Sequence, residues 1–202
     1  MATTTITTTT LLDVLRTRSR ATGFSSTLAI VVLGTLFITL CAKIQVPVWP
    51  VPVTLQGLAI AAIAAAFGLR IGVATVGLYL LEGAAGLPVF ATGGSLAYFV
   101  GPTGGFLVGF LVMAAIIGYA ADCGASRRPL ALFAAMLAGD VALFAFGFVW
   151  LLALSGAAGW IDQSNVVASA FAGAVQPFIV WDILKMALAA LTVTGAWALA
   201  RC

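Results

Sequence analysis

Three ionisable residues stand inside long apolar stretches of the sequence: Asp140, Asp182 and Lys185. Charged groups at membrane depth are costly and usually functional. Asp182 and Lys185 are three residues apart, so on a helix they share a face. A lysine can meet a ligand carboxylate, and an aspartate can accept hydrogen bonds from ligand N–H groups. The pair therefore predicts either a ligand site or a self-neutralising structural pair, and Asp140 is interpreted as structural.

Other kinds of chemistry find little support in the sequence. There is no histidine, and Cys41, Cys123 and Cys202 lack the CxxC spacing of metal sites, so neither a metal nor a cofactor is expected. The phosphate-binding loop GxxxxGK[ST] is absent, so ATP hydrolysis would belong to another subunit. Besides Asp140, Asp182 and Lys185, an intramembrane enzyme could use Glu82, so few acid and base groups are available for catalysis. The net charge of +3 is too small to indicate nucleic-acid binding.

Membrane spans are the elements that must position these residues. Hydrophobic residues make up 63% of the chain and charged residues 7%, with a mean hydropathy of +1.19. A soluble domain carries about 25% charged residues. Because a span needs roughly 20 apolar residues, about six runs qualify, and we predict an all-α integral membrane protein, a compact bundle of six transmembrane helices. The predicted spans are 22–42, 54–69, 71–81, 103–121, 130–154 and 177–200.

The N-terminal segment 1–21 is Thr-rich and then basic, and we predict a disordered cytoplasmic tail before one membrane domain, 22–202. The arginines then predict the orientation. With both termini in the cytoplasm, every inward segment is basic, and Lys43 alone falls in an outward loop. The inward arginines are Arg16, Arg18, Arg20, Arg70, Arg127, Arg128 and Arg201.

The long loops, 43–53, 82–102 and 155–176, then face outward. Elaborated loops are where binding is expected, which favours uptake or sensing over export. In the first loop, Pro47, Pro50 and Pro52 forbid regular helix and favour extended backbone.

Glycines and aromatic residues are the other candidates for a ligand site. The stretch Gly-Pro-Thr-Gly-Gly-Phe (101–106) opens the fourth span, where glycines let a ligand approach backbone N–H groups. Close helix packing through Gly105 and Gly109 is the alternative interpretation. The outward aromatic residues are either interfacial anchors or the wall around a ring-containing ligand. They are Trp49, Phe90, Tyr98, Phe99 and Trp181.

Four stretches are ordered and spaced as in one known family. They are Ala-Lys-Ile-Gln-Val-Pro-Val-Trp-Pro-Val-Pro-Val-Thr-Leu-Gln (42–56), Gly-Leu-Pro-Val-Phe-Ala (86–91), Gly-Pro-Thr-Gly-Gly-Phe (101–106) and Pro-Phe-Ile-Val-Trp-Asp-Ile-Leu-Lys (177–185). In these stretches the chain resembles the BioY family of bacterial biotin transporters, the substrate-binding S components of energy-coupling-factor transporters.

The resemblance implies biotin as the ligand, bound between the outer loops and the sixth span. It also implies a membrane coupling subunit and two ATP-binding-cassette ATPases as partners, besides membrane lipid. The Ala-xxx-Ala pattern that S components often show on the first span is only partial here, at Ser25, Ala29, Leu33 and Phe37. We expect the binding residues to be Asp182, Lys185, Lys43, Gln56, Trp49, Phe90, Thr92, Gly93, Gly94, Tyr98, Gly101 and Gly104.

Three alternatives stay open beside biotin uptake. The first is an S component for another vitamin, such as thiamin or riboflavin, which a binding assay with several vitamins would separate. The second is an intramembrane enzyme, against which the small number of acid and base groups weighs. The third is a purely structural membrane subunit, against which the outward loops and the pair of Asp182 and Lys185 weigh.

Overall fold

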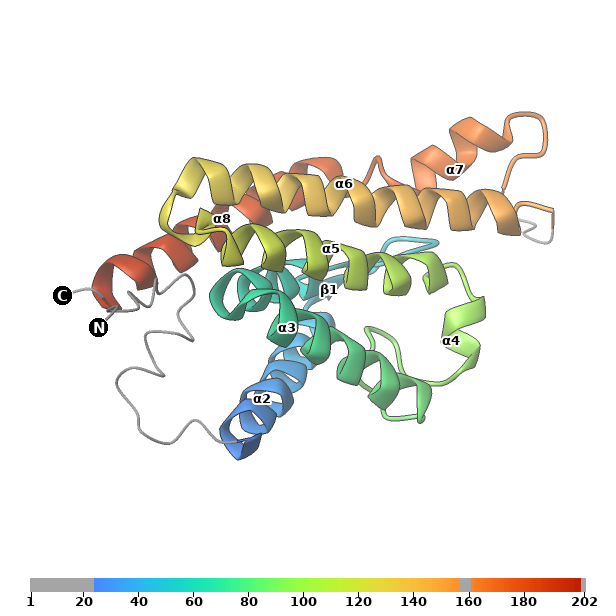
Figure 1. Ribbon diagram of the computed structural model, residues 1–202. Helices are drawn as coiled ribbons and strands as arrows, with labels where there is room; N and C mark the ends of the chain where they lie inside the picture. The colour runs from blue at the N-terminus through green and yellow to red at the C-terminus, as the bar shows by residue number, and fades with distance from the viewer. Residues whose placement is uncertain (1–23, 157–160, 201–202) are drawn as a thin grey trace, which may run out of the picture.

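The structure is a computed structural model that describes residues 24–156 and 161–200, and it is built largely of helices (Figure 1). Five described stretches of helix are long and apolar enough to cross a membrane. The long helices are α2 (Phe24–Lys43), α3 (Gln56–Ala84), α5 (Gly104–Asp122), α6 (Pro129–Leu154) and α8 (Ile179–Ala200). The shorter elements are α4 (Ala97–Val100), η1 (Ala125–Arg127), α7 (Val166–Ala174), β1 (Gln45–Val46) and β2 (Val53–Thr54). The predicted tail, 1–21, lies outside the described residues.

Helix α3 reverses direction at Gly68, where the backbone adopts φ 82° and ψ −177°. That conformation is essentially restricted to glycine. A methyl group on Gly72 would lie 3.0 Å from the Cα of Ala64. In a continuous helix, residues eight apart are separated by about 12 Å along the axis, so the two arms of α3 must fold back on each other. The arms correspond to the predicted second and third spans, and the reversal comes two residues before Arg70.

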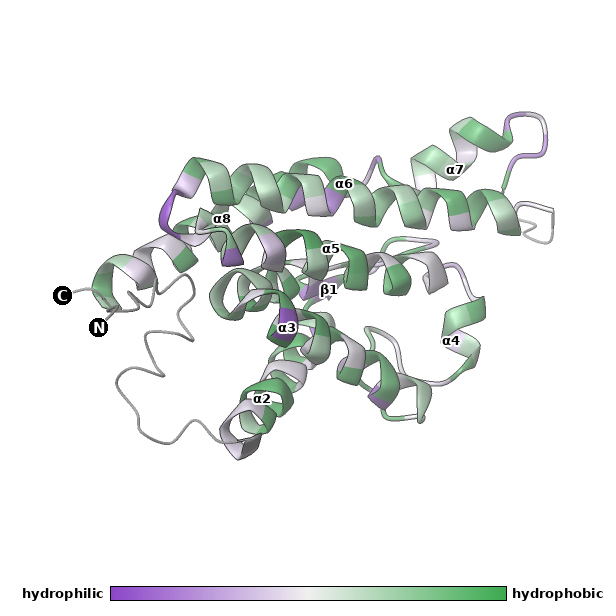
Figure 2. Cartoon of the chain, viewed as in Figure 1, coloured by the Kyte–Doolittle hydropathy of each residue, from purple (hydrophilic) through white to green (hydrophobic). Residues whose placement is uncertain are grey.

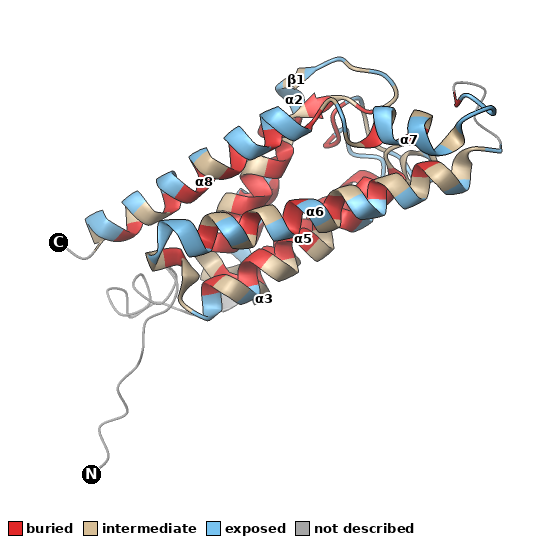
Figure 3. Ribbon diagram, turned by 90° about the horizontal axis from the view of Figure 1, so that it is seen from above, coloured by how far each residue is buried: buried red, intermediate tan, exposed pale blue. Residues whose placement is uncertain are grey.

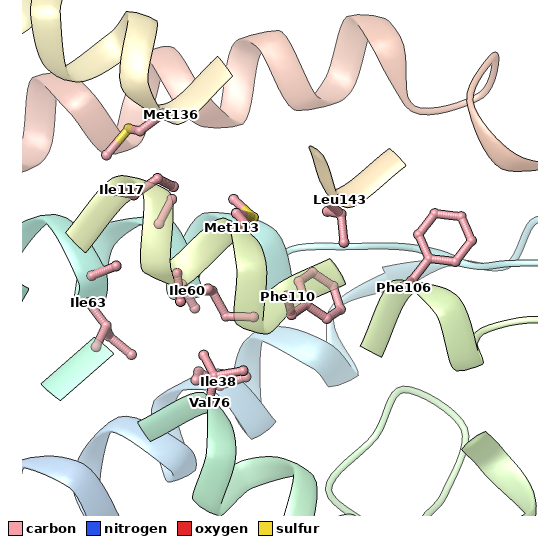
Figure 4. Packing of buried hydrophobic residues seen from close by; sticks show 14 of the residues in the cluster. Ile38, Ile60, Ile63, Val76, Phe106, Phe110, Met113, Ile117, Met136 and Leu143 are labelled. Carbon is pink, nitrogen blue, oxygen red and sulfur yellow. The ribbon is translucent and has the colours of Figure 1, made fainter. Parts of the chain in front are cut away.

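Helix α5 lies at the centre of the bundle, between α3 on one side and α6 on the other. Helices α3 and α5 are mostly buried, whereas only about a third of α2, α6 and α8 is buried. Figure 4 shows Phe110 and Met113 of α5 pointing between Ile60 of α3 and Leu143 of α6. The core is therefore a continuous layer of aliphatic and aromatic side chains along the inner helix.

The outward faces of α2, α6 and α8 are apolar as well as exposed (Figures 2 and 3). Leu33, Leu40, Val141, Leu184 and Leu191 are examples of large exposed hydrophobic side chains on these helices. Apolar patches of this extent are rare on soluble monomers, but lipid tails cover them at no cost. The chain is therefore a multi-pass membrane protein.

One end of the bundle holds the tight turns. The reversal of α3 lies against the turn between α5 and α6, and two hydrogen bonds join them. Ser126 Oγ donates to the carbonyl of Ala65 at 2.7 Å, and the N–H of Leu69 donates to Asp122 Oδ2 at 3.2 Å. The end of α8 joins them, with the guanidinium carbon of Arg127 lying 5.0 Å from the ring centre of Trp197.

The opposite end holds the elaborated segments, with α4 and α7 at the right of Figure 1. Residues 45–46 and 53–54 pair as a short antiparallel ribbon, in the loop where extended backbone was expected, and the rest of the described fold is helical. Helix α8 begins at Ile179, two residues after the predicted start of the sixth span at residue 177.

Candidate ligand-binding site

The predicted pair on α8 forms an ion pair between Lys185 Nζ and Asp182 Oδ1, so the two side chains do share a helix face. Asp182 is 4% exposed and Lys185 is 9% exposed. Lys185 Nζ also donates to the carbonyl oxygen of Thr54 at 3.0 Å. The lysine thereby joins α8 to the end of the β1–β2 ribbon, which is distant in the sequence.

A chamber of about 60 Å³ lies over this pair, at the end of the bundle that carries the ribbon. This volume is enough to hold several water molecules. Aromatic rings make a large part of the wall, and several pack on one another, as in Phe144–Phe178 at 5.6 Å and Phe90–Tyr98 at 4.8 Å between ring centres. The aromatic lining residues are Phe90, Tyr98, Phe106, Phe110, Phe144 and Phe178.

Two buried polar atoms at the chamber have no hydrogen-bond partner among the described residues. They are Nε2 of Gln56, which lines the chamber, and Oδ1 of Asp140, one helical turn away from Leu143 and Phe144. Asp140 is 5% exposed, and its carboxyl group interacts electrostatically with Lys185. An unpaired buried polar atom costs about 1–3 kcal/mol, so the Gln56 amide is a donor that a ligand carbonyl would satisfy.

A wider vestibule of about 570 Å³ adjoins the chamber and shares Pro52, Tyr98 and Thr103 with it. Its walls are the tip of the ribbon and the segment 92–103. Trp49 lines it and is 72% exposed. The two spaces therefore adjoin at a boundary formed by Pro52, Tyr98 and Thr103.

The loop that carries Phe90 is fastened to the end of α2. Lys43 Nζ donates to the carbonyl oxygen of Phe90 at 2.6 Å, and Gln45 Nε2 donates to that of Ala91 at 3.3 Å. The Phe90 ring fits only because Gly83 has no side chain, since a Cβ there would overlap the ring. Lys43 therefore holds a wall of the chamber and does not line it.

The predicted site residues divide into three groups. Asp182, Lys185, Gln56, Phe90 and Tyr98 come together in the chamber. The vestibule brings together Trp49, Thr92, Tyr98 and Gly101.

The third group, Lys43, Gly93, Gly94 and Gly104, lines neither space. Gly93 bridges to Phe90 through the backbone. A Cβ on Gly94 would overlap the Leu87 carbonyl, and one on Gly104 would overlap the Phe99 carbonyl. The last two glycines thus permit close packing of the loops around the site.

Several chamber residues were not predicted. Phe178 lies four residues before Asp182, and Phe144 lies four after Asp140. Residues four apart share a helix face, so this spacing could have predicted that both phenylalanines lie beside the acids. The carbonyl of Thr54 had no such signal. In contrast, Trp181 is 59% exposed and lines neither space, so its side chain belongs to the outer surface of α8.

The fold and the chamber define a multi-pass membrane protein with a small-molecule site at one end of a helical bundle. Comparison with known proteins makes this specific. The model of the BioY family matches residues 9–201, nearly the whole chain. The chain belongs to the BioY family.

Similar proteins agree with this assignment. The chain is 32% identical to the biotin transporter BioY2 of Lactococcus lactis, over 80% of this chain and 84% of that protein. It is 35% identical to the biotin transporter BioY of Thermotoga maritima, over 78% of this chain and 87% of the other. The crystal structure of the S-component for biotin from an ECF-type ABC transporter is similar in fold, with a TM-score of 0.72 at 24% identity, covering 86% of this chain and 92% of that one.

Proposed function

We propose that this chain binds biotin and takes it up across the bacterial cytoplasmic membrane, as the substrate-binding component of an ATP-driven vitamin transporter. The observation that carries the proposal is the buried Asp182–Lys185 pair in an aromatic chamber. Biotin has a ureido group that both donates and accepts hydrogen bonds, an apolar bicycle, and a chain that ends in a carboxylate. The relatives that match over most of the chain are named as biotin transporters.

We infer that the ureido end of biotin enters the chamber and that the carboxylate stays in the vestibule. Lys185 already has Asp182 as its ion partner, and the charge of Asp140 acts on it too. Because Asp182 and Lys185 are the two charged residues among the described residues that line the chamber, and they pair with each other, the chamber offers no net positive charge to a ligand carboxylate. Asp182 is suited to accept from a ureido N–H, while Lys185 and Gln56 are suited to donate to the ureido carbonyl. The aromatic walls suit the bicycle.

Titration calorimetry on the purified protein tests both the ligand and its orientation. Biotin is expected to bind at one site per chain, and neither thiamin nor riboflavin is expected to bind. The methyl ester of biotin, which has no carboxylate charge, should bind within about tenfold of biotin. Tighter binding of thiamin or riboflavin would overturn the choice of ligand. Loss of binding by the ester alone would place the carboxylate in the chamber.

Energy coupling is proposed to come from a membrane coupling subunit and two ATP-binding-cassette ATPases. The stripe of Ser25, Ala29, Leu33 and Phe37 lies on the exposed face of α2, which leaves it available to a partner helix. Liposomes that contain this chain alone should bind biotin but should not accumulate it when ATP is supplied. Accumulation driven by ATP in such liposomes would contradict this assignment.

The proposed orientation places the chamber and vestibule outside the cell, with both termini in the cytoplasm. Among the described residues, Arg70, Arg127 and Arg128 all belong to the turns at the end opposite the chamber, as the positive-inside rule requires. Residues 22–202 are proposed to form one membrane domain that follows the cytoplasmic tail 1–21.

A further inference from the structure

The end of the bundle opposite the ligand chamber contains a second hollow, of about 460 Å³. It lies where α5 ends and α6 begins, and Arg127, Arg128 and Cys123 are the largest side chains in its wall. The other lining residues are alanines and a glycine, which leave the space open. Biotin binding makes no use of this hollow, because the chamber lies at the far end of the helices.

The turn that carries the two arginines is held in place. Gly124 adopts a left-handed conformation with φ 89°, which lets the chain leave α5 sharply. The next turn is anchored by the hydrogen bond from buried Ser126 to the carbonyl of Ala65. The guanidinium group of Arg127 lies over the ring of Trp197. The arginines are therefore presented from a fixed backbone and not from a loose loop.

The charges favour an anion with several oxygen atoms. Within the part of the chain that the structure describes, no aspartate or glutamate lines the hollow. The nearest acid in the sequence, Asp122, accepts a hydrogen bond from the N–H of Leu69. Arginine is always charged in proteins, and its planar fork of donors matches a phosphate group. Two such groups in one open hollow suit a phosphate.

Exposed side chains of two membrane-spanning helices lie next to this hollow. Tyr119 and Leu130, the neighbours of the lining residues Ala120 and Ala131, are both exposed, and Leu130 is 83% exposed. Apolar side chains this exposed, on helices that cross the membrane, face acyl chains. The hollow thus lies at the end of two lipid-facing helices, at the level where headgroup phosphates are found, and basic pockets between helices are known to take such headgroups.

We propose that this hollow binds the phosphate of an anionic phospholipid headgroup, with Arg127 and Arg128 as its donors. The acyl chains lie along the exposed faces that include Tyr119 and Leu130. The site is a lipid site distinct from the biotin site, and it anchors the turn between α5 and α6 at the membrane surface.

Native mass spectrometry of the full-length protein in detergent tests the proposal directly. The probes are phosphatidylglycerol and phosphatidylcholine with the same acyl chains, added in equal amounts. Phosphatidylglycerol should be retained in preference. Arg128→Gln should lower its apparent affinity at least about fivefold, since each charged hydrogen bond contributes strongly to binding. Arg127→Gln should act in the same direction, and Arg128→Gln keeps the test valid if the loss of stacking on Trp197 disturbs folding.

Arg70→Gln is the matched control, because Arg70 is exposed near the same end of the bundle but does not line the hollow. It should retain phosphatidylglycerol as the unmodified chain does. An equal loss in Arg70→Gln, or equal retention of the two lipids by the unmodified chain, would overturn the proposal. Displacement of the lipid by low millimolar inorganic phosphate would show that the hollow takes free phosphate, and the lipid assignment would fall.

Cys123 supplies an independent readout, because it lines the same hollow. In a Cys202→Ser background, phosphatidylglycerol should slow the reaction of Cys123 with a soluble thiol reagent, and phosphatidylcholine should not. The buried thiol of Cys41 should contribute little to the signal. Equal rates with both lipids would contradict the lipid site.

Discussion

Replacing Lys185 by methionine removes the cation of the chamber and keeps a side chain of similar length. Lys185 Nζ bonds both Asp182 and the carbonyl of Thr54. If Lys185 donates to the ureido carbonyl, the variant loses one charge-assisted hydrogen bond to the ligand, about 1.5–3 kcal/mol. That corresponds to a biotin affinity about ten- to hundredfold weaker. Titration calorimetry measures it.

The same substitution also affects folding, because it leaves the carboxylate of Asp182 buried without its ion partner. Breaking a buried pair from one side costs about 3–5 kcal/mol, whereas removing both charges is often nearly neutral. The double variant Asp182→Asn, Lys185→Met should therefore recover most of the stability lost by Lys185→Met. Thermal unfolding in detergent measures the recovery.

The comparison between these two variants separates binding from structure. If the pair binds biotin, the double variant regains stability but its affinity stays low. If the double variant regains an affinity within about threefold of the unmodified chain, the pair is structural and the reasoning is refuted. Trp181→Leu is the matched control on α8, because that exposed side chain lines neither space, and its affinity should be unchanged.

Three further predictions concern the loop, the charges and the orientation. Gly83→Val should lower the free energy of unfolding by about 1–3 kcal/mol and weaken biotin binding, because the valine side chain would overlap the Phe90 ring. Gly77→Val is the control on the same arm of α3, where a side chain would meet open space, and it should change thermal unfolding far less. Asp140→Asn keeps the shape of the side chain but removes a negative charge that interacts with Lys185. Because biotin carries a negative carboxylate and its methyl ester does not, the ratio of the affinity for biotin to the affinity for the ester should rise. An unchanged ratio in competition binding would show that Asp140 does not influence the ligand charge. In intact cells of a Cys202→Ser background, Cys123 should react with a membrane-impermeant thiol reagent only after permeabilisation, and strong labelling beforehand would reverse the proposed orientation.

The predicted spans agree closely with the helices because composition and length decide membrane helices almost locally. A backbone in lipid must satisfy its own hydrogen bonds, so a long apolar run becomes a helix whatever its neighbours are. The reversal at Gly68 was also foreseeable in outline, since a short break separates two apolar runs. The reversal occurs at Gly68, two residues before Arg70, because the required backbone angles are essentially restricted to glycine.

The candidate site was partly predictable for the same reason. Asp182 and Lys185 are on one helix, and helical spacing alone places them on one face. Gln56, Phe90 and Tyr98 were also chosen from the sequence, and the structure brings them to the same chamber. The separate role of Lys43, which bonds the backbone of the Phe90 loop, was not predictable from its own position in the chain.

The sequence by itself determined that the protein lies in a membrane and that a charged pair faces one side of its last helix. Both follow from local properties, namely the apolar content of each run and the period of the helix. Only the tertiary structure decided that Lys185 meets the carbonyl of Thr54, and that Phe144 of α6 closes the chamber beside Phe178. Local rules describe each helix separately, whereas these contacts depend on how helices pack across loops, which brings together side chains that are remote along the chain.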